Sequence, residues 1–191
     1  MNKAVIIFSA FFLLNVCFVW NNTSINYQDK ALAKTLKKVG ILSFNDVHEL
    51  AIPDSLSEFD AIQGRFFTVN AANEANLKYI YVGRVNSCRA GGCAIPDDGS
   101  TDINAEYFDY FILFDESISV LQVKVFNYQA THGHEISARG WLSQFIGHCS
   151  GDKLEVDKNV DAISGATVSV YAITSDIESK TNVLEVLARM K

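Results

Sequence analysis

Two neighbouring stretches of aromatic and β-branched residues constrain the fold of this chain more than any other feature. They run from Tyr107 to Asp115 and from Ile118 to Tyr128, and the turn-forming residues Asp115-Glu-Ser117 join them. Apolar and polar residues alternate along the second stretch, with Leu121, Val123 and Val125 set against Gln122 and Lys124. We therefore expect an antiparallel hairpin with one face toward the core and one face in water.

The remaining periodic segments predict one more strand and several helices. The run from Lys78 to Val85 is typical of a strand. Apolar residues at helical spacing indicate helices over residues 29–39, 139–148 and 166–177, and the second of these carries Trp141, Leu142, Phe145 and Ile146. A separate short helix is predicted over 183–190, with Asn182 and Glu185 as its capping pair.

These elements together predict the α+β class, with an antiparallel sheet packed against helices in a single domain. The domain follows an N-terminal hydrophobic segment, residues 1–22. Residues 23–75 are expected to form a linker helix and the first part of the domain. Residues 76–191 are expected to form its main part.

The N-terminal segment predicts a link to the membrane. Lys3 precedes an apolar stretch from Ala4 to Trp20, which is intermediate in length between a signal-peptide core and a spanning helix, and no small-residue cleavage site follows. We expect an uncleaved anchor in the inner membrane, with the domain on the extracytoplasmic, or periplasmic, side because of Lys3. A cleaved signal, a lipoprotein signal at Cys17 and an internal hydrophobic helix are the alternatives.

The formal net charge of −6 argues against nucleic-acid binding. Proteins that bind nucleic acid present basic surfaces that displace counterions from phosphates. We therefore expect no nucleic-acid partner, and the charge gives no support to binding at an anionic membrane surface.

The cysteines allow three interpretations. Cys88 and Cys93 enclose two glycines, so a small-loop disulfide is the first interpretation in an oxidising compartment, and it leaves Cys149 unpaired. Metal binding is the second, although the nearest histidines, His132 and His134, do not complete a usual zinc spacing. Inert thiols are the third.

A cluster of small and hydroxyl-bearing residues precedes the predicted helix over 166–177. Ser164, Gly165, Ala166 and Thr167 place a threonine hydroxyl at the helix N-terminus, where unpaired backbone N–H groups and the helix dipole favour a phosphate. Local physics alone favours a simpler interpretation, in which the cluster only caps the helix and a Thr167→Ala change costs about 1 kcal/mol.

The segment Asp161-x-x-Ser164-Gly165-Ala166-Thr167 resembles the flavinylation motif of the FMN-binding domain family. This family includes the G subunit of the Rnf complex and the C subunit of the sodium-pumping NADH:quinone reductase. The resemblance implies that an ApbE-type flavin transferase uses FAD and magnesium to attach FMN covalently to Thr167. It extends in weaker form over residues 79–177, through the predicted strands and His132-Gly-His134-Glu135-Ile136.

The resemblance also implies a function and a set of neighbours for the flavin. The protein is expected to be an extracytoplasmic electron-transfer flavoprotein, a subunit or module rather than a stand-alone enzyme, with membrane redox partners. Candidates for holding the cofactor, besides the motif residues and Val168, are His134, Glu135 and Trp141. Each of these three also has a structural interpretation, as a solvated loop residue, a helix cap and a core residue respectively.

Two other functions remain open from the sequence. A thiol-disulfide redox protein would use Cys88 and Cys93, although their spacing is not that of thioredoxin-like enzymes. A non-redox binding or adaptor domain would use Ser164 to Thr167 as a helix cap alone.

Overall fold

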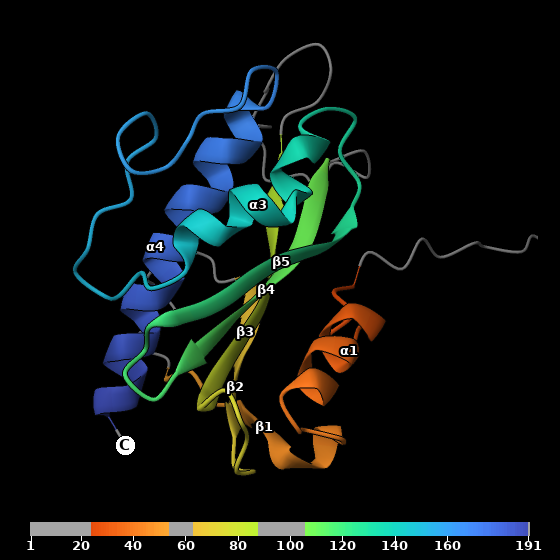
Figure 1. Ribbon diagram of the computed structural model, residues 1–191, viewed down its shortest axis with the longest axis vertical. Coiled ribbons are helices and arrows are strands. Elements are labelled where there is room, and N and C mark those ends of the chain that lie inside the picture. Colours follow the sequence, from red (N-terminus) through yellow and green to blue (C-terminus); the bar gives the residue numbers. More distant parts are fainter. Residues whose placement is uncertain (1–23, 54–62, 88–105, 191) are drawn as a thin grey trace, which may run out of the picture.

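The computed structural model describes residues 24–53, 63–87 and 106–190, which form a sheet with helices on both faces (Figure 1). The strands are β1 (Val47–Leu50), β2 (Gly64–Val69), β3 (Leu77–Asn86), β4 (Tyr107–Asp115) and β5 (Val120–Tyr128). The helices are α1 (Lys30–Lys38), α3 (Arg139–Leu142) and α4 (Thr167–Arg189), with single turns of 3-10 helix at Phe44–Asp46, His134–Ser137 and Ser143–Phe145.

The sheet is an antiparallel meander in the order β1-β2-β3-β4-β5, so each strand pairs with its neighbour in the described chain. The predicted pairing of residues 107–115 with residues 118–128 is confirmed as the β4–β5 hairpin. The α+β prediction is confirmed for the sheet and its helices, while the hydrophobic segment before them lies outside the described residues.

The two faces of the sheet support two separate hydrophobic cores. Tyr81, Tyr110 and Ile112 face α4, in a core that also contains Ile173 and Ile177. The alternate residues Ile80, Val82 and Phe111 face α1, where Leu32 and Leu36 pack on them. Neighbouring side chains of a strand point to opposite faces of the sheet. Because both faces are covered, the residues of β4 between Tyr107 and Asp115 are buried.

The predicted wet face of the hairpin is therefore wrong for β4, whereas on β5 Gln122 and Lys124 stay half-exposed beside the buried Val123 and Val125, as the alternation predicts. Leu121 and Phe126 pack against the core beneath α1, while Val123 and Val125 belong to the core beneath α4. A register shift between Leu113 and Phe114 of β4 separates Leu121 from the regular alternation.

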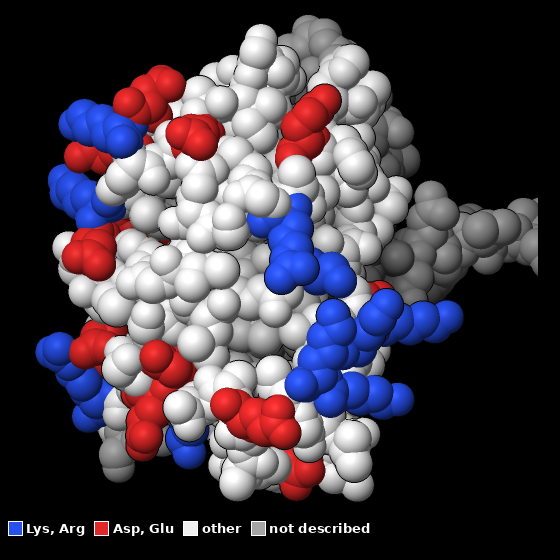
Figure 2. Space-filling view, viewed as in Figure 1, with Lys and Arg blue, Asp and Glu red and all other residues white. Residues whose placement is uncertain are grey.

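α1 covers the second face because one side of it is apolar. Asp29 caps it by accepting the Ala31 N–H at 2.6 Å. Leu32, Thr35 and Leu36 are buried, and exposed lysines gather over the other side of the helix (Figure 2), namely Lys30, Lys34, Lys37 and Lys38. The helix predicted over residues 29–39 thus packs on the sheet as a layer of the fold.

α4 is one continuous helix of 23 residues, so the separate C-terminal helix with an Asn182 cap is wrong. Thr181 is buried, and its hydroxyl donates to the Ile177 carbonyl at 2.7 Å within the helix. Asn182 instead accepts hydrogen bonds from Ser150 and Gly151 through Oδ1. The apolar stripe continues through Leu184 and Leu187 and keeps the helix on the sheet.

The segment 139–148 is helical only in part. α3 passes into a 3-10 turn at Ser143–Phe145 and ends before Gly147, which has a φ of +88°. Leu142 and Phe145 are buried as their spacing predicts, whereas Ile146 is exposed because the helix has already ended.

Candidate functional site

The first turn of α4 presents the predicted flavin acceptor at the surface. Thr167 is the first residue of the helix and is exposed, which confirms its predicted place at a helix N-terminus. Ala166 is buried at the N-cap position, and the first helical hydrogen bond joins the Val170 N–H to the Ala166 carbonyl at 2.9 Å. Ser164, Gly165 and Val168 are exposed around it.

Among the described residues, no side chain caps this helix. The predicted capping role of Ser164 to Thr167 is therefore wrong, because alanine, which has no polar side chain, occupies the N-cap position. The backbone reaches the helix through a turn in which the Ala166 N–H bonds to the Ile163 carbonyl at 3.1 Å, and Gly165 has a φ of +83°. Within the part of the chain that the structure describes, the first N–H groups of α4 thus have no side-chain acceptor, and N–H groups at such a position can bind an anion.

The loop that leads to Thr167 is fastened to α3 and the turn after it. The Trp141 indole N–H donates to the Asp161 carbonyl at 2.8 Å, and Asp161 N–H donates to Gln144 Oε1 at 2.7 Å. Trp141 also contacts Phe145 edge to face, with ring centroids 5.3 Å apart. The structure thus brings Trp141 and Asp161 together through the backbone of Asp161, whose side chain is exposed.

The segment around His134 lies against the same helical turn. The Tyr128 hydroxyl donates to the His132 carbonyl at 2.5 Å, and the His134 ring meets the Tyr128 ring edge-on at 5.4 Å between centroids. A Cβ on Gly133 would stand only 2.7 Å from Ser169 Oγ. Ser169 Oγ is 2.8 Å from Ser87 Oγ, so this contact also ties α4 to the end of β3.

The His134 segment and Thr167 nevertheless lie on different sides of α4. At 3.6 residues per turn, Ser169 points about 160° away from Thr167 around the helix axis. Gly133 is packed against Ser169, and both His134 and Glu135 are exposed. Of the predicted cofactor-binding residues, the structure joins Trp141 of α3 to the motif loop through the Asp161 carbonyl, and it places His134 and Glu135 in the turn that follows Gly133, which packs on Ser169 of α4.

A groove runs along α4 on the Thr167 side and was not predicted. It has a volume of about 330 Å³ and lies between residues 154–156 and the α4 residues Tyr171, Thr174, Ser175 and Glu178. The Leu154 N–H donates to Glu178 Oε2 at 2.8 Å and holds the two walls together. One sequence signal pointed to these residues, since Tyr171, Thr174 and Glu178 follow Thr167 at the i+4, i+7 and i+11 positions of one helix face.

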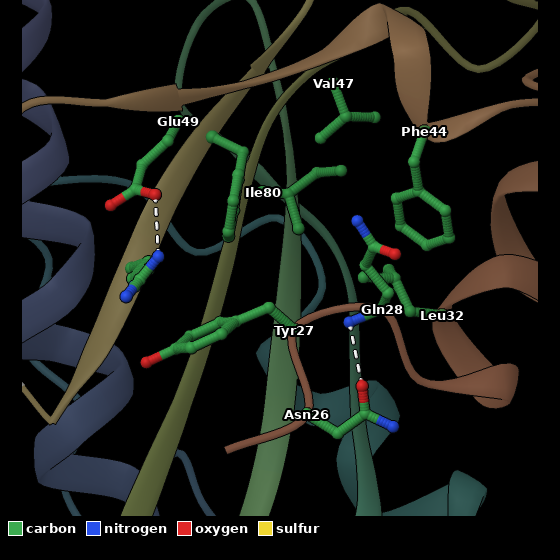
Figure 3. A pocket seen from close by; sticks show the side chains of 10 residues that line it. Asn26, Tyr27, Gln28, Leu32, Phe44, Val47, Glu49 and Ile80 are labelled. Atoms are coloured by element: carbon green, nitrogen blue, oxygen red, sulfur yellow. Dashed lines mark hydrogen bonds and ion pairs between the residues drawn. The ribbon is translucent and has the colours of Figure 1, made fainter. Parts of the chain in front are cut away.

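A larger hollow of about 410 Å³ lies beside α1, on the opposite face of the sheet (Figure 3). Ile80 and Phe44 contribute to its apolar walls. The Arg65 guanidinium pairs with Glu49 at 2.9 Å and lies over the Tyr27 ring, 4.6 Å from the centroid. Because its two opposite charges already pair and it is separated from Thr167 by the sheet, we do not assign this hollow to the candidate site.

The thiol and metal hypotheses concern other parts of the chain. Cys88 and Cys93 lie outside the described residues, and Cys149 is a half-buried free thiol 3.5 Å from the Gly147 carbonyl oxygen. Within residues 24–53, 63–87 and 106–190, no cluster of three or more histidine, cysteine or acidic side chains is arranged to hold a metal. In the same ranges, no helix has the length and apolar character needed to cross a membrane.

No protein-family model matches the chain, and comparisons with curated proteins and with solved structures find no match either.

Proposed function

We propose that FMN is attached covalently to Thr167 through a phosphoester, and that the protein works as an extracytoplasmic electron-transfer module tethered to the inner membrane. The observation that carries this proposal is an exposed threonine at the first position of a 23-residue helix that no side chain in the described ranges caps. That position coincides with the acceptor threonine of the motif that Asp161 to Thr167 resembles.

The local structure supports the fit of a phosphate at this site. Exposure of Thr167 leaves its hydroxyl accessible to a modifying enzyme. The space beside Gly165 is open, since a Cβ built there would have no described atom within 4 Å. The N–H groups of the first turn, which no described side chain accepts from, and the positive end of the helix dipole favour the phosphodiester charge.

The residues around Thr167 then have defined tasks. Ala166 anchors the turn in the core, while Trp141 and Gln144 hold the loop at Asp161, so the acceptor is presented on a fixed backbone. FMN supplies the capacity to accept and pass on electrons, and the covalent link prevents its loss outside the cytoplasm.

Attachment is a phosphoryl transfer to Thr167 catalysed by an ApbE-type flavin transferase. The Thr167 hydroxyl oxygen bonds to the phosphorus on the FMN side of the FAD pyrophosphate. The pyrophosphate P–O bond breaks, AMP leaves with the electron pair, and the hydroxyl proton passes to a base of the transferase. The transferase and its magnesium ion supply the catalysis, so the protein itself acts only as the acceptor.

The test is co-expression with a flavin transferase, followed by ultraviolet imaging of a denaturing gel and peptide mass spectrometry. Wild-type protein should give a fluorescent band, and the peptide that contains Thr167 should carry one FMN, less one water. Thr167→Ala should abolish the band. Ser179→Ala serves as the matched control, because it removes another hydroxyl from α4 away from the first turn.

Two results would contradict the proposal. One is a fluorescent band that persists in Thr167→Ala. The other is a dark wild-type band in cells where a known acceptor domain, expressed with the same transferase, is labelled.

A further inference from the structure

The outer side of α1 gathers positive charge on a protein whose formal net charge is −6 (Figure 2). Its exposed lysines lie within an arc of about 100° around the helix axis, opposite the buried Leu32 and Leu36. They are Lys30, Lys34, Lys37 and Lys38. Lys124 adds to them from the sheet, because it pairs with Phe111 across β4 and β5 and so faces the side that α1 covers.

The acidic side chains near α1 offset this charge only in part. No acidic residue occurs within α1 itself. The Asp29 carboxylate is engaged as the helix cap, and Glu49 pairs with Arg65. Glu74 is exposed beside the C-terminal end of α1, where its N–H donates to the Val39 carbonyl at 3.2 Å. The charged side chains that α1 projects into solvent are therefore all positive.

An exposed apolar side chain follows the same helix. Gly40, with a φ of +90°, ends the helical path, and the Ile41 N–H turns back to the Leu36 carbonyl at 3.0 Å. Ile41 is buried, whereas Leu42 is 78% exposed, the highest value among the large apolar side chains of the described ranges. Lysines beside an exposed apolar side chain are typical of surfaces that lie in the headgroup region of a membrane.

α1 is also the helix nearest along the chain to the proposed membrane tether. Trp20, the last residue of the apolar segment, precedes Lys30, the first residue of α1, by ten positions. Even a fully extended stretch of that length reaches only about 35 Å. The tether therefore keeps the lysines of α1 close to the bilayer, whose anionic lipids attract basic groups beside a membrane segment.

We propose that the outer side of α1 docks on anionic lipid headgroups of the membrane that holds the N-terminal segment, with the lysines against phosphates and Leu42 at the headgroup level. The inference rests on the tether in the proposed function and not on its flavin. α4 covers the opposite face of the sheet from α1 (Figure 1). Docking therefore turns Thr167 away from the bilayer, where a flavin transferase and a redox partner outside the membrane can reach it.

The test uses the full chain in lipid nanodiscs of phosphatidylcholine, with or without phosphatidylglycerol. A brief pulse of a water-soluble acetylating reagent, followed by peptide mass spectrometry, gives the acetylation rate of each lysine. Phosphatidylglycerol should slow the α1 lysines about threefold, because headgroups shield a docked lysine. Lys153, in the loop before α4, should react at the same rate in both kinds of disc. High salt should remove the difference by screening the charges.

Matched variants test which side of the domain docks, with Lys38 as the reporter. Replacing Lys30, Lys34 and Lys37 together by glutamine should remove the protection of Lys38, and Leu42→Ser should reduce it. Replacing Lys153, Lys158 and Arg189 together by glutamine makes the same change in net charge elsewhere and should leave the protection intact. All of these side chains are exposed, so the variants should fold.

The outcomes separate this inference from the proposed function. Equal acetylation of the α1 lysines in both kinds of disc would overturn the inference alone, as would equal loss of protection in the two triple variants. Protection in detergent that grows with protein concentration would assign the outer side of α1 to a second copy of the chain instead. Docking of a protein that takes up no FMN would overturn the flavin and leave this inference standing. A chain that does not enter the discs would overturn the tether and the inference together.

Discussion

The Lys180 ammonium lies 2.8 Å from Asp176 Oδ1, in an ion pair that is almost closed to solvent between α4 and the sheet. The two side chains are 3% and 19% exposed respectively. The Tyr110 hydroxyl donates to the other carboxylate oxygen at 2.5 Å, and burial, followed by the charge of Asp176, raises the pKa of Tyr110. Asp176 thus holds a buried cation and a buried hydroxyl on one side of α4.

Removing the charge of Asp176 should be strongly destabilising. Asp176→Asn leaves the Lys180 ammonium buried without a counter-ion, for which the expected loss is about 3–5 kcal/mol of unfolding free energy. Urea denaturation measures this loss. Glu185→Gln is the control, because its i,i+4 pair with Arg189 is largely in water and should cost less than about 0.5 kcal/mol.

The double variant Asp176→Asn with Lys180→Met tests the mechanism. Methionine removes the buried charge while filling similar space, so the double variant should be more stable than Asp176→Asn alone. A loss in Asp176→Asn no larger than in Glu185→Gln would contradict the assignment.

Gly83 is required by the position of the Tyr81 ring. A Cβ on Gly83 would come within 2.2 Å of the Tyr81 hydroxyl oxygen and 2.4 Å of its Cζ. Gly83→Ala should therefore lower the unfolding free energy by about 1–3 kcal/mol through overpacking. Tyr81→Leu removes the clashing atoms, so Gly83→Ala should cost much less in that background.

Gly64 serves as the comparison for the Gly83→Ala and Tyr81→Leu variants. A Cβ on Gly64 would meet not only the Tyr81 hydroxyl but also the Val82 carbonyl oxygen at 2.6 Å and the Gly83 Cα at 2.7 Å. Tyr81→Leu should not rescue Gly64→Ala, because the backbone clashes remain. Equal rescue of both alanine variants in urea denaturation would refute this account.

Local periodicity accounts for the parts of the fold that were predicted correctly. A sequence pattern of about ten to twenty residues was enough to predict three elements: the helix at residues 29–39, the strand at residues 78–85 and the β4–β5 hairpin. The acceptor position was also predicted locally, since the stripe that begins at Ala166 sets where the helix starts.

The errors arose where distant contacts decide the structure. The pattern of β5 gives no sign that α1 covers its second face, so Leu121 was assigned to the wrong side. Asn182 resembles a cap in isolation, but the buried Thr181 and Leu184 carry α4 past it. The groove at Thr174 was missed because residues 154–156 reach α4 only through tertiary packing.

Gly133 should resist substitution more than another glycine with a similar backbone. Gly133 and Gly147 have φ values of +86° and +88°, so alanine at either position suffers the same left-handed strain. Only at Gly133 would a Cβ also meet Ser169 Oγ at 2.7 Å and the Tyr128 hydroxyl oxygen at 3.0 Å, since the space at Gly147 is open.

Gly133→Ala should therefore be less stable than Gly147→Ala by about 1–3 kcal/mol in urea denaturation. Ser169→Ala in the Gly133→Ala background should recover part of the difference by removing the nearest atom. Equal losses in the two alanine variants would show that the His134 segment is not packed on α4 as described.

His148 should make the protein less stable in mild acid. The imidazole is 7% exposed and its Nε2 has no hydrogen-bond partner among the described residues. Burial lowers the pKa of His148 below its ordinary value of 6.5, although the charges of Asp152 and Glu178 partly oppose the shift. The folded protein therefore keeps this imidazole neutral at a pH where the unfolded chain already protonates it.

The sign of the effect follows from that difference in bound protons. Above about pH 6.5 neither the folded nor the unfolded state binds the proton, so the contribution of His148 to the unfolding free energy is constant. As the pH falls below 6.5, the unfolded state gains a proton and the unfolding free energy drops by at most about 1.4 kcal/mol per pH unit. The drop ends when the pH reaches the pKa of His148 in the folded state. Urea denaturation at pH 7.5 and 5.5 should show this drop. His148→Gln should flatten it, whereas His48→Gln, at an exposed position on β1, should preserve it. A wild-type slope that survives unchanged in His148→Gln would assign the pH dependence to other groups.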